Sequence, residues 1–246
     1  MNKSLLILLF ILQSFSSYSV FSDDITAEHV LLAVDAIRAP GENFAFNLDV
    51  EQQDSEDNRA VSFIVNVKDQ NKSLVTYTAP DSSKGKKILM VGENLWIYIP
   101  GTRMPIRISA QQKVSSGVSN ADVARVVYNL DYKADKLIKE VIDKQTNYHV
   151  SLSAKTEGAA YQRIELWTSS DDYRPLKADF YTKAGQKLKT ILYKDYQSVL
   201  GKQRPMLLEV FDDLNKEQKV LMRYSNMQIA DTPESYFQKS YLPQLP

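Results

Sequence analysis

The sequence contains no cysteine and only two histidines in 246 residues. Without cysteine the chain forms no disulfide bonds, and it lacks the residue at which bacterial lipoproteins are lipidated. The histidines, His29 and His149, do not stand at the helix or hairpin spacing of a zinc site. We therefore predict no metal site, a core that is stable without cross-links, and two histidines that are solvated or hydrogen-bonded structural residues.

An excess of charge and the common catalytic motifs are also absent. Thirty basic side chains balance thirty acidic ones, whereas a nucleic-acid-binding protein normally shows a basic excess. No Gly-x-Ser-x-Gly elbow, P-loop or His-Glu-x-x-His motif occurs. The segment from Asp213 to Glu217 begins like a calcium loop but lacks the later glycine and glutamate, so it reads as a hairpin turn. We predict no catalytic residues, no cofactor and no nucleic-acid partner.

Long apolar runs are scarce, and the clearest one lies near the N-terminus. LLILLFIL (Leu5–Leu12) is short for a bilayer span and is followed by small and polar residues. This pattern predicts a signal peptide over residues 1–22, cleaved after Ser22 or Ser19, and hence export; the alternative is an uncleaved anchor. The rest, residues 23–246, is long enough to build one core, and we predict a single domain.

The remaining sequence consists mainly of short stretches with alternating apolar residues. FAFNLDV, for example, places Phe44, Phe46 and Leu48 on one face. About eleven such stretches recur with turn residues between them, which is typical of an antiparallel meander. Three short helices are also predicted. They begin at Thr26, at Ser119 or Asn120, and at Thr232, where Pro233 would take the first helical position.

Three short helices are too few to cover a sheet of this width completely. The economical fold is mainly β with a few helices: a strongly curved antiparallel sheet with the helices laid across its open side over an apolar space. A closed barrel and a two-layer sandwich are the alternatives.

The stretch LWIYIP is apolar on both faces of any strand that it forms. Leu95, Ile97 and Ile99 take one face, and Trp96 and Tyr98 take the other. Either the protein's own fold covers both faces, or one face lines a ligand cavity or a partner surface.

The region around LWIYIP resembles the outer-membrane lipoprotein-sorting protein family, whose members are LolA-like periplasmic carriers. KGKKILMVGENLWIYIPGTRMPIRIS is followed by a Ser/Gly loop and by SNADVARVVYNLDY, as in that family. The matching positions are Lys84, Gly85, Leu89, Gly92, Leu95, Trp96, Ile97, Tyr98, Pro100, Arg103, Arg107, Ile108, Ser109, Ser119, Asp122, Ala124, Arg125, Asp131 and Tyr132.

The resemblance implies a LolA/LolB-like incomplete β-barrel with helices covering a hydrophobic cavity. It also implies a monomeric periplasmic carrier that shelters the acyl chains of lipoproteins or lipids between the inner and outer membrane. An inner-membrane transporter of the resistance-nodulation-division (RND) or ABC type and an outer-membrane acceptor would be its partners. The chain is longer than LolA and shares little of LolA's own motif, which leaves the cargo open.

Inward-facing side chains of the predicted strands are the candidates for the acyl cavity. The segments Val30–Ile37 and Ser115–Val127 are candidates for a lid. Three arginines are candidates for contact with head groups or a membrane partner, the alternative being solvated side chains. The cavity candidates are Phe44, Phe46, Phe63, Val65, Leu89, Trp96, Tyr98, Ile164, Leu166 and Phe180, and the arginines are Arg103, Arg107 and Arg125.

Two other functions compete with the carrier. A non-catalytic adaptor subunit of an envelope or lipid-export complex would use the surplus apolar surface as a protein interface. A lipid hydrolase would need a nucleophile constellation that the sequence does not display.

Overall fold

The computed structural model describes residues 25–41, 43–53, 59–115, 117–125, 127–215 and 218–245. The predicted signal peptide and part of the predicted Asp213–Glu217 turn therefore lie outside the described residues. Within the described part of the chain, no helix combines the length and the apolarity that crossing a bilayer requires.

The described chain consists of fifteen strands, two α-helices and two 3-10 helices. The helices are α1 (Ala27–Arg38), α2 (Asn120–Ala124), η1 (Glu234–Phe237) and η2 (Lys239–Gln244). The strands are β1 (Phe44–Gln53), β2 (Arg59–Lys68), β3 (Lys72–Ala79), β4 (Lys87–Val91), β5 (Asn94–Tyr98), β6 (Ile106–Ile108), β7 (Lys113–Ser115), β8 (Val118–Ser119), β9 (Tyr132–Ile142), β10 (Gln145–Ala154), β11 (Arg163–Ser169), β12 (Pro175–Tyr181), β13 (Lys187–Val199), β14 (Lys202–Asp212) and β15 (Lys219–Ile229).

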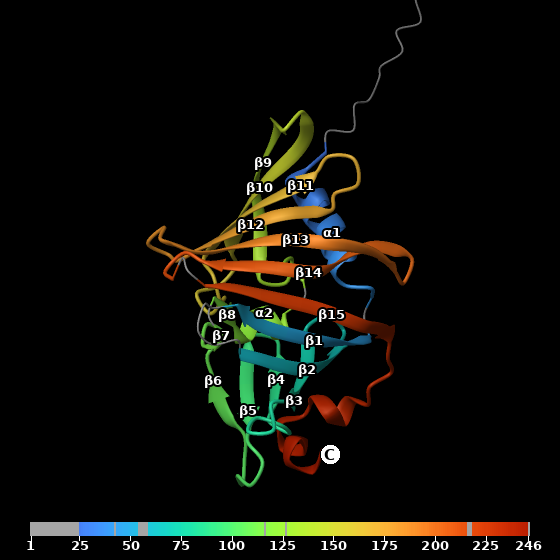
Figure 1. Cartoon of the computed structure of the whole chain (residues 1–246), viewed down its shortest axis with the longest axis vertical. Coiled ribbons are helices and arrows are strands. Elements are labelled where there is room, and N and C mark those ends of the chain that lie inside the picture. Colours follow the sequence, from blue (N-terminus) through green and yellow to red (C-terminus); the bar gives the residue numbers. More distant parts are fainter. Residues whose placement is uncertain are drawn as a thin grey trace, which may run out of the picture.

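Thirteen strands form one curved antiparallel sheet, in the order β6-β5-β4-β3-β2-β1-β15-β14-β13-β12-β11-β10-β9. Two runs of neighbouring strands, β1 to β6 and β9 to β15, meet where β1 pairs with β15 (Figure 1). The order ends at β6 and β9, so the described sheet is not closed into a barrel. The predicted fold class, a large curved sheet with few helices, is confirmed.

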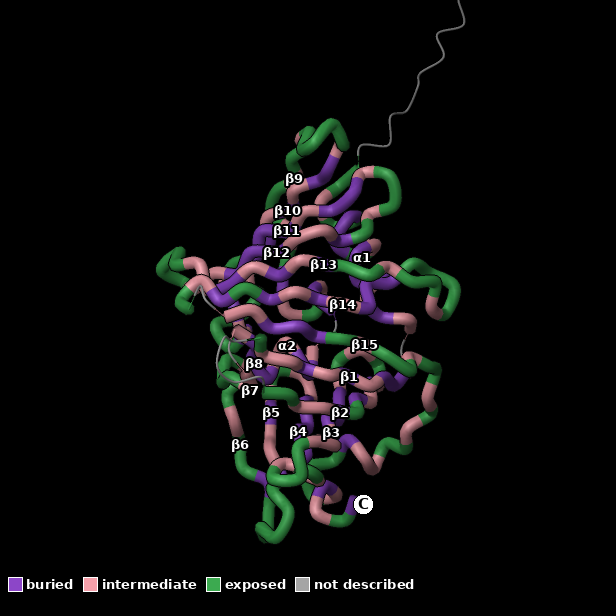
Figure 2. The backbone as a smooth tube through the Cα atoms, in the orientation of Figure 1, coloured by how far each residue is buried: buried purple, intermediate pink, exposed green. Residues whose placement is uncertain are grey.

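Alternation along the strands builds the core on the concave face. On β1, Phe44 and Leu48 are fully buried, and Leu48 lies opposite Phe63 of β2. Val50 lies opposite Met222 of β15, which carries the same core across the junction of the two runs. In Figure 2, buried residues alternate with partly exposed ones along many of the strands.

Both α-helices pack on this concave face. The hydroxyl of Thr26 accepts a hydrogen bond from the backbone N–H of His29, as predicted for the N-cap of α1. Val30, Leu31 and Val34 of α1 are fully buried, and the helix contacts β9, β10 and β14. The helix α2 instead contacts β3 and β4. The helices thus cover different halves of the curved sheet.

Two local predictions were wrong. Apolar alternation did not predict the strand β9, because as an edge strand it is rich in exposed lysines and shows little such alternation. The C-terminal segment forms 3-10 turns instead of an α-helix, and Thr232 does not cap it. The Thr232 hydroxyl donates instead to the side-chain carbonyl of Asn66, at 3.1 Å.

The second apolar face of LWIYIP is covered by the chain's own C-terminal segment. Leu95 is buried in the main core, whereas Tyr98 and the partly buried Trp96 face the opposite side of the sheet. There they pack in a separate cluster with Leu74 and Leu89 against Phe237, Leu242 and Leu245. The Lys87 ammonium donates to the backbone carbonyl of Leu245 at 3.0 Å and fixes the end of the segment.

We predict that Leu242→Ala loosens the C-terminal segment. Leu242 is fully buried, so truncation to alanine removes apolar contacts and leaves a cavity, at a cost of about 2 kcal/mol. Hydrogen exchange should then accelerate over η1 and η2 before the main sheet opens. Leu200→Ala, at a leucine that is 43% exposed, is the matched control and should leave exchange unchanged. Equal exchange in both variants would contradict this assignment.

Candidate functional site

A cavity of about 560 Å³ lies beside the segment that connects β6 to α2. Its walls come from four parts of the chain that are distant in sequence. The lining residues are Gln111, Lys113, Gly117, Ser119, Glu157, Ala160, Tyr161, Gln162, Thr182, Lys183, Leu188, Lys189 and Leu214. The cavity is therefore amphipathic, with an apolar wall of alanine, leucine and a tyrosine ring and a rim of amides and paired charges.

One wall is the short ribbon formed by β7 and β8. Gly117, at its turn, has a φ of +67°, and a Cβ atom there would lie 3.3 Å from the Cβ of Asp212 and from Val210 Cγ1. Glycine is therefore needed both for the backbone conformation and for the close approach to β14. The Lys113 ammonium also pairs with Asp212 at 2.9 Å, which holds the ribbon against the same strand.

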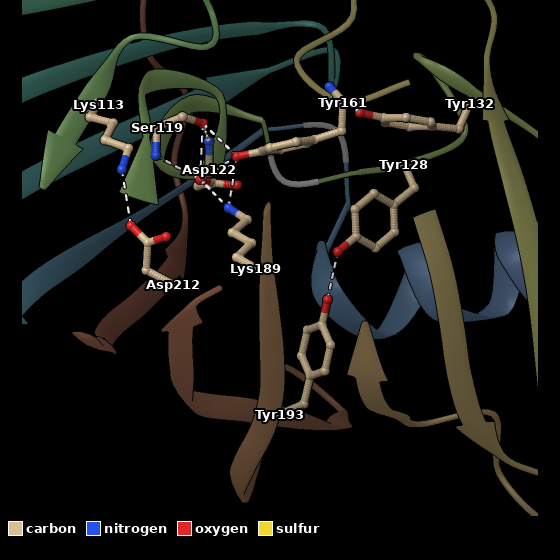
Figure 3. A network of polar contacts seen from close by, with 9 residues as sticks. All are labelled: Lys113, Ser119, Asp122, Tyr128, Tyr132, Tyr161, Lys189, Tyr193 and Asp212. Carbon is tan, nitrogen blue, oxygen red and sulfur yellow. Dashed lines mark hydrogen bonds and ion pairs between the residues drawn. The ribbon is translucent and has the colours of Figure 1, made fainter. Parts of the chain in front are cut away.

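At the floor of the cavity, Lys189 of β13 forms a buried ion pair with Asp122 of α2, which lies behind it (Figure 3). Tyr161 joins it: its hydroxyl accepts from Lys189 Nζ at 2.7 Å and donates to Asp122 Oδ2 at 2.9 Å. Asp122 also accepts from the backbone N–H of Ser119 at 2.7 Å, closing the capping box of α2. The Asp122 carboxylate thus binds Ser119 at the end of β8, completes the N-terminal cap of α2 and neutralises the buried Lys189 ammonium.

The lysine stands in an aromatic environment. Its side chain is 2% exposed, and Nζ lies 4.6 Å from the ring centre of Tyr161 and 4.8 Å from that of Phe180. Burial lowers the pKa of Lys189 below its usual range, against the opposing effect of Asp122. Burial also raises the pKa of the Tyr161 hydroxyl well above its usual range, so this hydroxyl stays protonated.

Below this floor the interior of the curved sheet is lined by tyrosines. The hydroxyls of Tyr128 and Tyr193 are 2.6 Å apart, and the Arg38 guanidinium lies 3.9 Å above the ring of Tyr128. A space of only about 40 Å³ remains beside Arg38 and Tyr128, and Tyr161 and Ala160 line both this space and the large cavity. These two residues are therefore the partition between the cavity and the interior.

Asp35 of α1 ties the helix to the chain that follows α2. Its two carboxylate oxygens accept from the backbone N–H groups of Tyr128 and Asn129, each at 2.7 Å. Burial raises the pKa of Asp35 to about 6, although Arg38 and the two N–H groups favour the ionised form. Asp35 therefore ties the first lid candidate to Tyr128 and Asn129, which directly follow the second lid candidate, Ser115–Val127.

A second hollow, of about 520 Å³, lies on the convex face around Trp167. The Trp167 ring stacks on His149 at 4.4 Å, and the Lys177 ammonium lies 4.4 Å from its centre. Glu165 accepts from the Ser151 hydroxyl at 2.7 Å and contacts the His149 ring at 2.8 Å. The carboxylate thus stands between serine and histidine, whereas a hydrolase needs the histidine between them. His149 is thus held by Glu165 and by the Trp167 ring.

The predicted cavity residues lie around the core instead of around the 560 Å³ cavity. Phe180 borders the small interior space, and Leu89, Trp96 and Tyr98 lie under the C-terminal segment. Contact of these side chains with a ligand stays a prediction. The others, all in the main buried cluster, are Phe44, Phe46, Phe63, Val65, Ile164 and Leu166.

The three predicted arginines lie in different surroundings. Arg103 is exposed, and Arg107 is exposed and donates to the side chain of Asn94 at 2.7 Å. Arg125 is turned inward, where it pairs with Asp131 at 2.9 Å and donates to the Gly92 carbonyl at 2.7 Å. Arg125 therefore ties the end of α2 to neighbouring segments, while the other two stay available at the surface.

The central residues of the site, Lys189 and Tyr161, were missed in the sequence. The alternation along β13 could have identified Lys189, because it lies on the same face of the strand as the inward-facing Ile191 and Tyr193. A lysine on an inward face indicates a buried partner of opposite charge. Among the described residues no cluster of three or more histidine or acidic side chains could hold a metal ion.

Comparisons with known proteins bear on the fold of the chain. A family model described as uncharacterized protein matches residues 69–244. A LolA superfamily protein from Nitrosomonas europaea is 32% identical, with a TM-score of 0.84 over 88% of this chain and 99% of that one. An outer membrane lipoprotein-sorting protein domain from Vibrio parahaemolyticus is 19% identical, with a TM-score of 0.73 over 89% of this chain and 100% of that one. A DUF1329 family protein from Desulfovibrio piger is 20% identical, with a TM-score of 0.73 over 88% of this chain and 97% of that one. No curated protein sequence matches the chain.

Proposed function

The chain belongs to the LolA superfamily, and we propose that it carries an acyl-bearing lipid or lipoprotein through the periplasm. The observation that carries this proposal is the 560 Å³ cavity with its apolar wall of Ala160, Leu188 and Leu214. Its volume falls in the usual range of small-molecule sites, about 300 to 1,000 Å³. Each methylene sheltered there contributes about 0.8 kcal/mol, which offsets its removal from a membrane.

The amphipathic lining suits a ligand with one apolar and one polar end. The apolar wall would hold the acyl chain, while Gln111, the exposed pair Lys183–Glu157 and Lys113, which pairs with the buried Asp212, form a polar rim for the head group. Tyr161, on the partition, would let a longer chain reach the interior if α2 moved. The polar contacts of Asp122 and Asp35 are what such a movement would have to break.

The adaptor alternative loses its main support. It depended on the second apolar face of LWIYIP as a protein interface, and the residues of that face pack against Phe237 and Leu242 of the same chain. A hydrolase likewise finds no support in the contacts of Ser151 and His149, because Glu165 lies between them. We therefore propose a carrier without catalytic activity and leave the choice between lipid and lipoprotein to experiment.

Native mass spectrometry of protein purified from its own cells without detergent tests the carrier. We expect a stoichiometric acylated species, and its mass would identify the cargo class. Protein that is empty on purification, and still empty after incubation with lipid vesicles and with lipoprotein, would overturn the proposal.

A variant that fills the cavity gives a sharper test. Ala160→Trp places a large ring at the cavity wall, and we predict that it lowers ligand occupancy by at least about tenfold because the acyl chain loses its space. The matched control is Ala60→Trp, at an exposed position of β2, and it should keep wild-type occupancy. Equal occupancy in the two variants would place the ligand elsewhere.

A further inference from the structure

The β5–β6 loop, taken here as residues 99–107 and so including the first two residues of β6, carries exposed apolar side chains at one end of the molecule. Met104 is 66% exposed, Ile106 57% and Ile99 38%. In Figure 1 this loop projects below the strands of the β1–β6 half, at the end opposite the β9–β10 hairpin. Single exposed apolar residues are ordinary, but three within eight positions of one projecting loop form a patch.

The charge of this loop has one sign. Arg103 and Arg107 are both exposed, and neither pairs with an acidic side chain within the described part of the chain. The sequence has no aspartate or glutamate between Glu93 and Asp122. In the neighbouring β3–β4 turn, a Cβ atom on Gly85 would lie 3.3 Å from Pro100 Cγ. This turn adds Lys84 and Lys86 against a single acid, Asp81.

The β9–β10 hairpin, at the opposite end, makes a useful contrast. It also exposes apolar side chains, with Val141 71% and Ile142 44% exposed. There, however, Glu140 and Asp143 alternate with lysines, so the charges balance. The two tips are alike in apolarity and differ in net charge.

We propose that the β5–β6 loop docks on the surface of an anionic lipid bilayer. Met104 and Ile106 would enter the boundary between head groups and acyl chains, and Arg103 and Arg107 would meet lipid phosphates. Exposed apolar side chains flanked by cations bind such surfaces by combining burial with attraction to anionic lipids. A protein partner is disfavoured, because three side chains on one loop offer far less area than a stable interface buries.

This docking goes beyond the carrier role and is independent of the cavity, which is lined by other residues. Flotation of delipidated full-length protein with vesicles tests it. The probes are vesicles of phosphatidylglycerol and phosphatidylethanolamine, compared with vesicles of phosphatidylcholine alone. We expect binding to the anionic vesicles, weakened by added salt because screening reduces the attraction of the arginines.

Two variants and one matched control separate the contributions. Met104→Ser/Ile106→Ser should lower vesicle affinity at least about tenfold, and Arg103→Gln/Arg107→Gln should lower it about fivefold per arginine and remove most of the salt dependence. Val141→Ser/Ile142→Ser makes the same apolar-to-polar change on the other tip and should bind as wild type. Because all variants keep the same N-terminal segment, that segment cannot produce a difference between them.

The outcomes are decisive in either direction. No binding of the wild type to anionic vesicles would overturn the proposal, as would equal losses in the loop variant and the control. Unchanged vesicle binding in the loop variant, with loss of a cross-linked protein instead, would assign the loop to a protein partner. Thermal unfolding confirms that each variant is folded, and native mass spectrometry of its cargo shows separately whether the carrier function survives.

Discussion

Asp122→Asn is expected to lower the free energy of unfolding by about 3–5 kcal/mol at pH 7, because it leaves a buried cation without a counter-ion. Lys189 is 2% exposed, and its described polar partners are Asp122 and the Tyr161 hydroxyl. The substitution also weakens the capping box with Ser119, which adds to the loss. Chemical denaturation followed by circular dichroism measures the change.

The double variant Asp122→Asn/Lys189→Met should recover most of this loss. Methionine fills nearly the same volume between the rings of Tyr161 and Phe180 and requires no counter-ion. The control is Lys183→Met, whose exposed partner is Glu157, and it should change stability by less than about 0.5 kcal/mol. A double variant that is no more stable than Asp122→Asn would show that the pair is not the coupled unit described here.

The pH dependence of Asp122→Asn has a definite sign. Burial lowers the pKa of Lys189 in the fold, so the unfolded chain binds a proton that the folded chain releases. Raising the pH then favours the fold, and removal of Asp122 enlarges this effect. The deficit of the variant should therefore shrink between pH 7 and about 9, below the range in which tyrosines of the unfolded chain ionise. A deficit that grows with pH would refute the assignment.

Asp35→Ala should have the next largest effect, about 2–4 kcal/mol at pH 7. The substitution leaves the buried N–H groups of Tyr128 and Asn129 without acceptors and removes the nearest carboxylate from Arg38. The helix α1 and the segment that follows α2 should then separate more readily, which hydrogen exchange at Tyr128 and Asn129 reports. Glu28→Ala, at an exposed position on the same helix, is the control and should cost less than about 1 kcal/mol.

The stability contributed by Asp35 should fall as the pH rises. Its pKa of about 6 in the fold lies above its ordinary value of 3.8, so the folded chain keeps a proton that the unfolded chain has lost. The contribution is complete below about pH 4 and is lost through pH 6. The difference between wild type and Asp35→Ala should therefore be larger at pH 4 than at pH 7, by an amount on the order of 3 kcal/mol. A smaller difference at pH 4 would mean that its hydrogen bonds outweigh its burial.

The elements that sequence predicted correctly are those set by local pattern. Alternation over FAFNLDV fixed the face that β1 buries, and Thr26 marked the start of α1 through a contact three residues away. Ser119, one of the two residues predicted to cap the second helix, is likewise the N-cap of α2. These features depend on neighbouring residues, so one chain suffices to read them.

The candidate site was much less predictable. Alternation identified which residues face inward, but it did not distinguish Phe44, packed in the core, from Leu188, at the cavity wall. The polar contacts among Tyr161, Asp122 and Lys189 join three segments separated by dozens of residues. The spacing of apolar residues along the sequence does not predict these contacts, because they depend on how strongly the sheet curves and where the ribbon β7–β8 approaches β14.

The sequence by itself determined that the chain is a wide antiparallel sheet with few helices and no cross-links, because backbone pairing and burial follow from the spacing of apolar residues and from the lack of cysteine. Only the tertiary structure decided that the second face of LWIYIP lies under Phe237 and Leu242, that Lys189 meets Asp122, and where the cavity opens. Those outcomes require segments far apart in the chain to meet, and the free energy of such contacts depends on geometry that the whole sheet imposes.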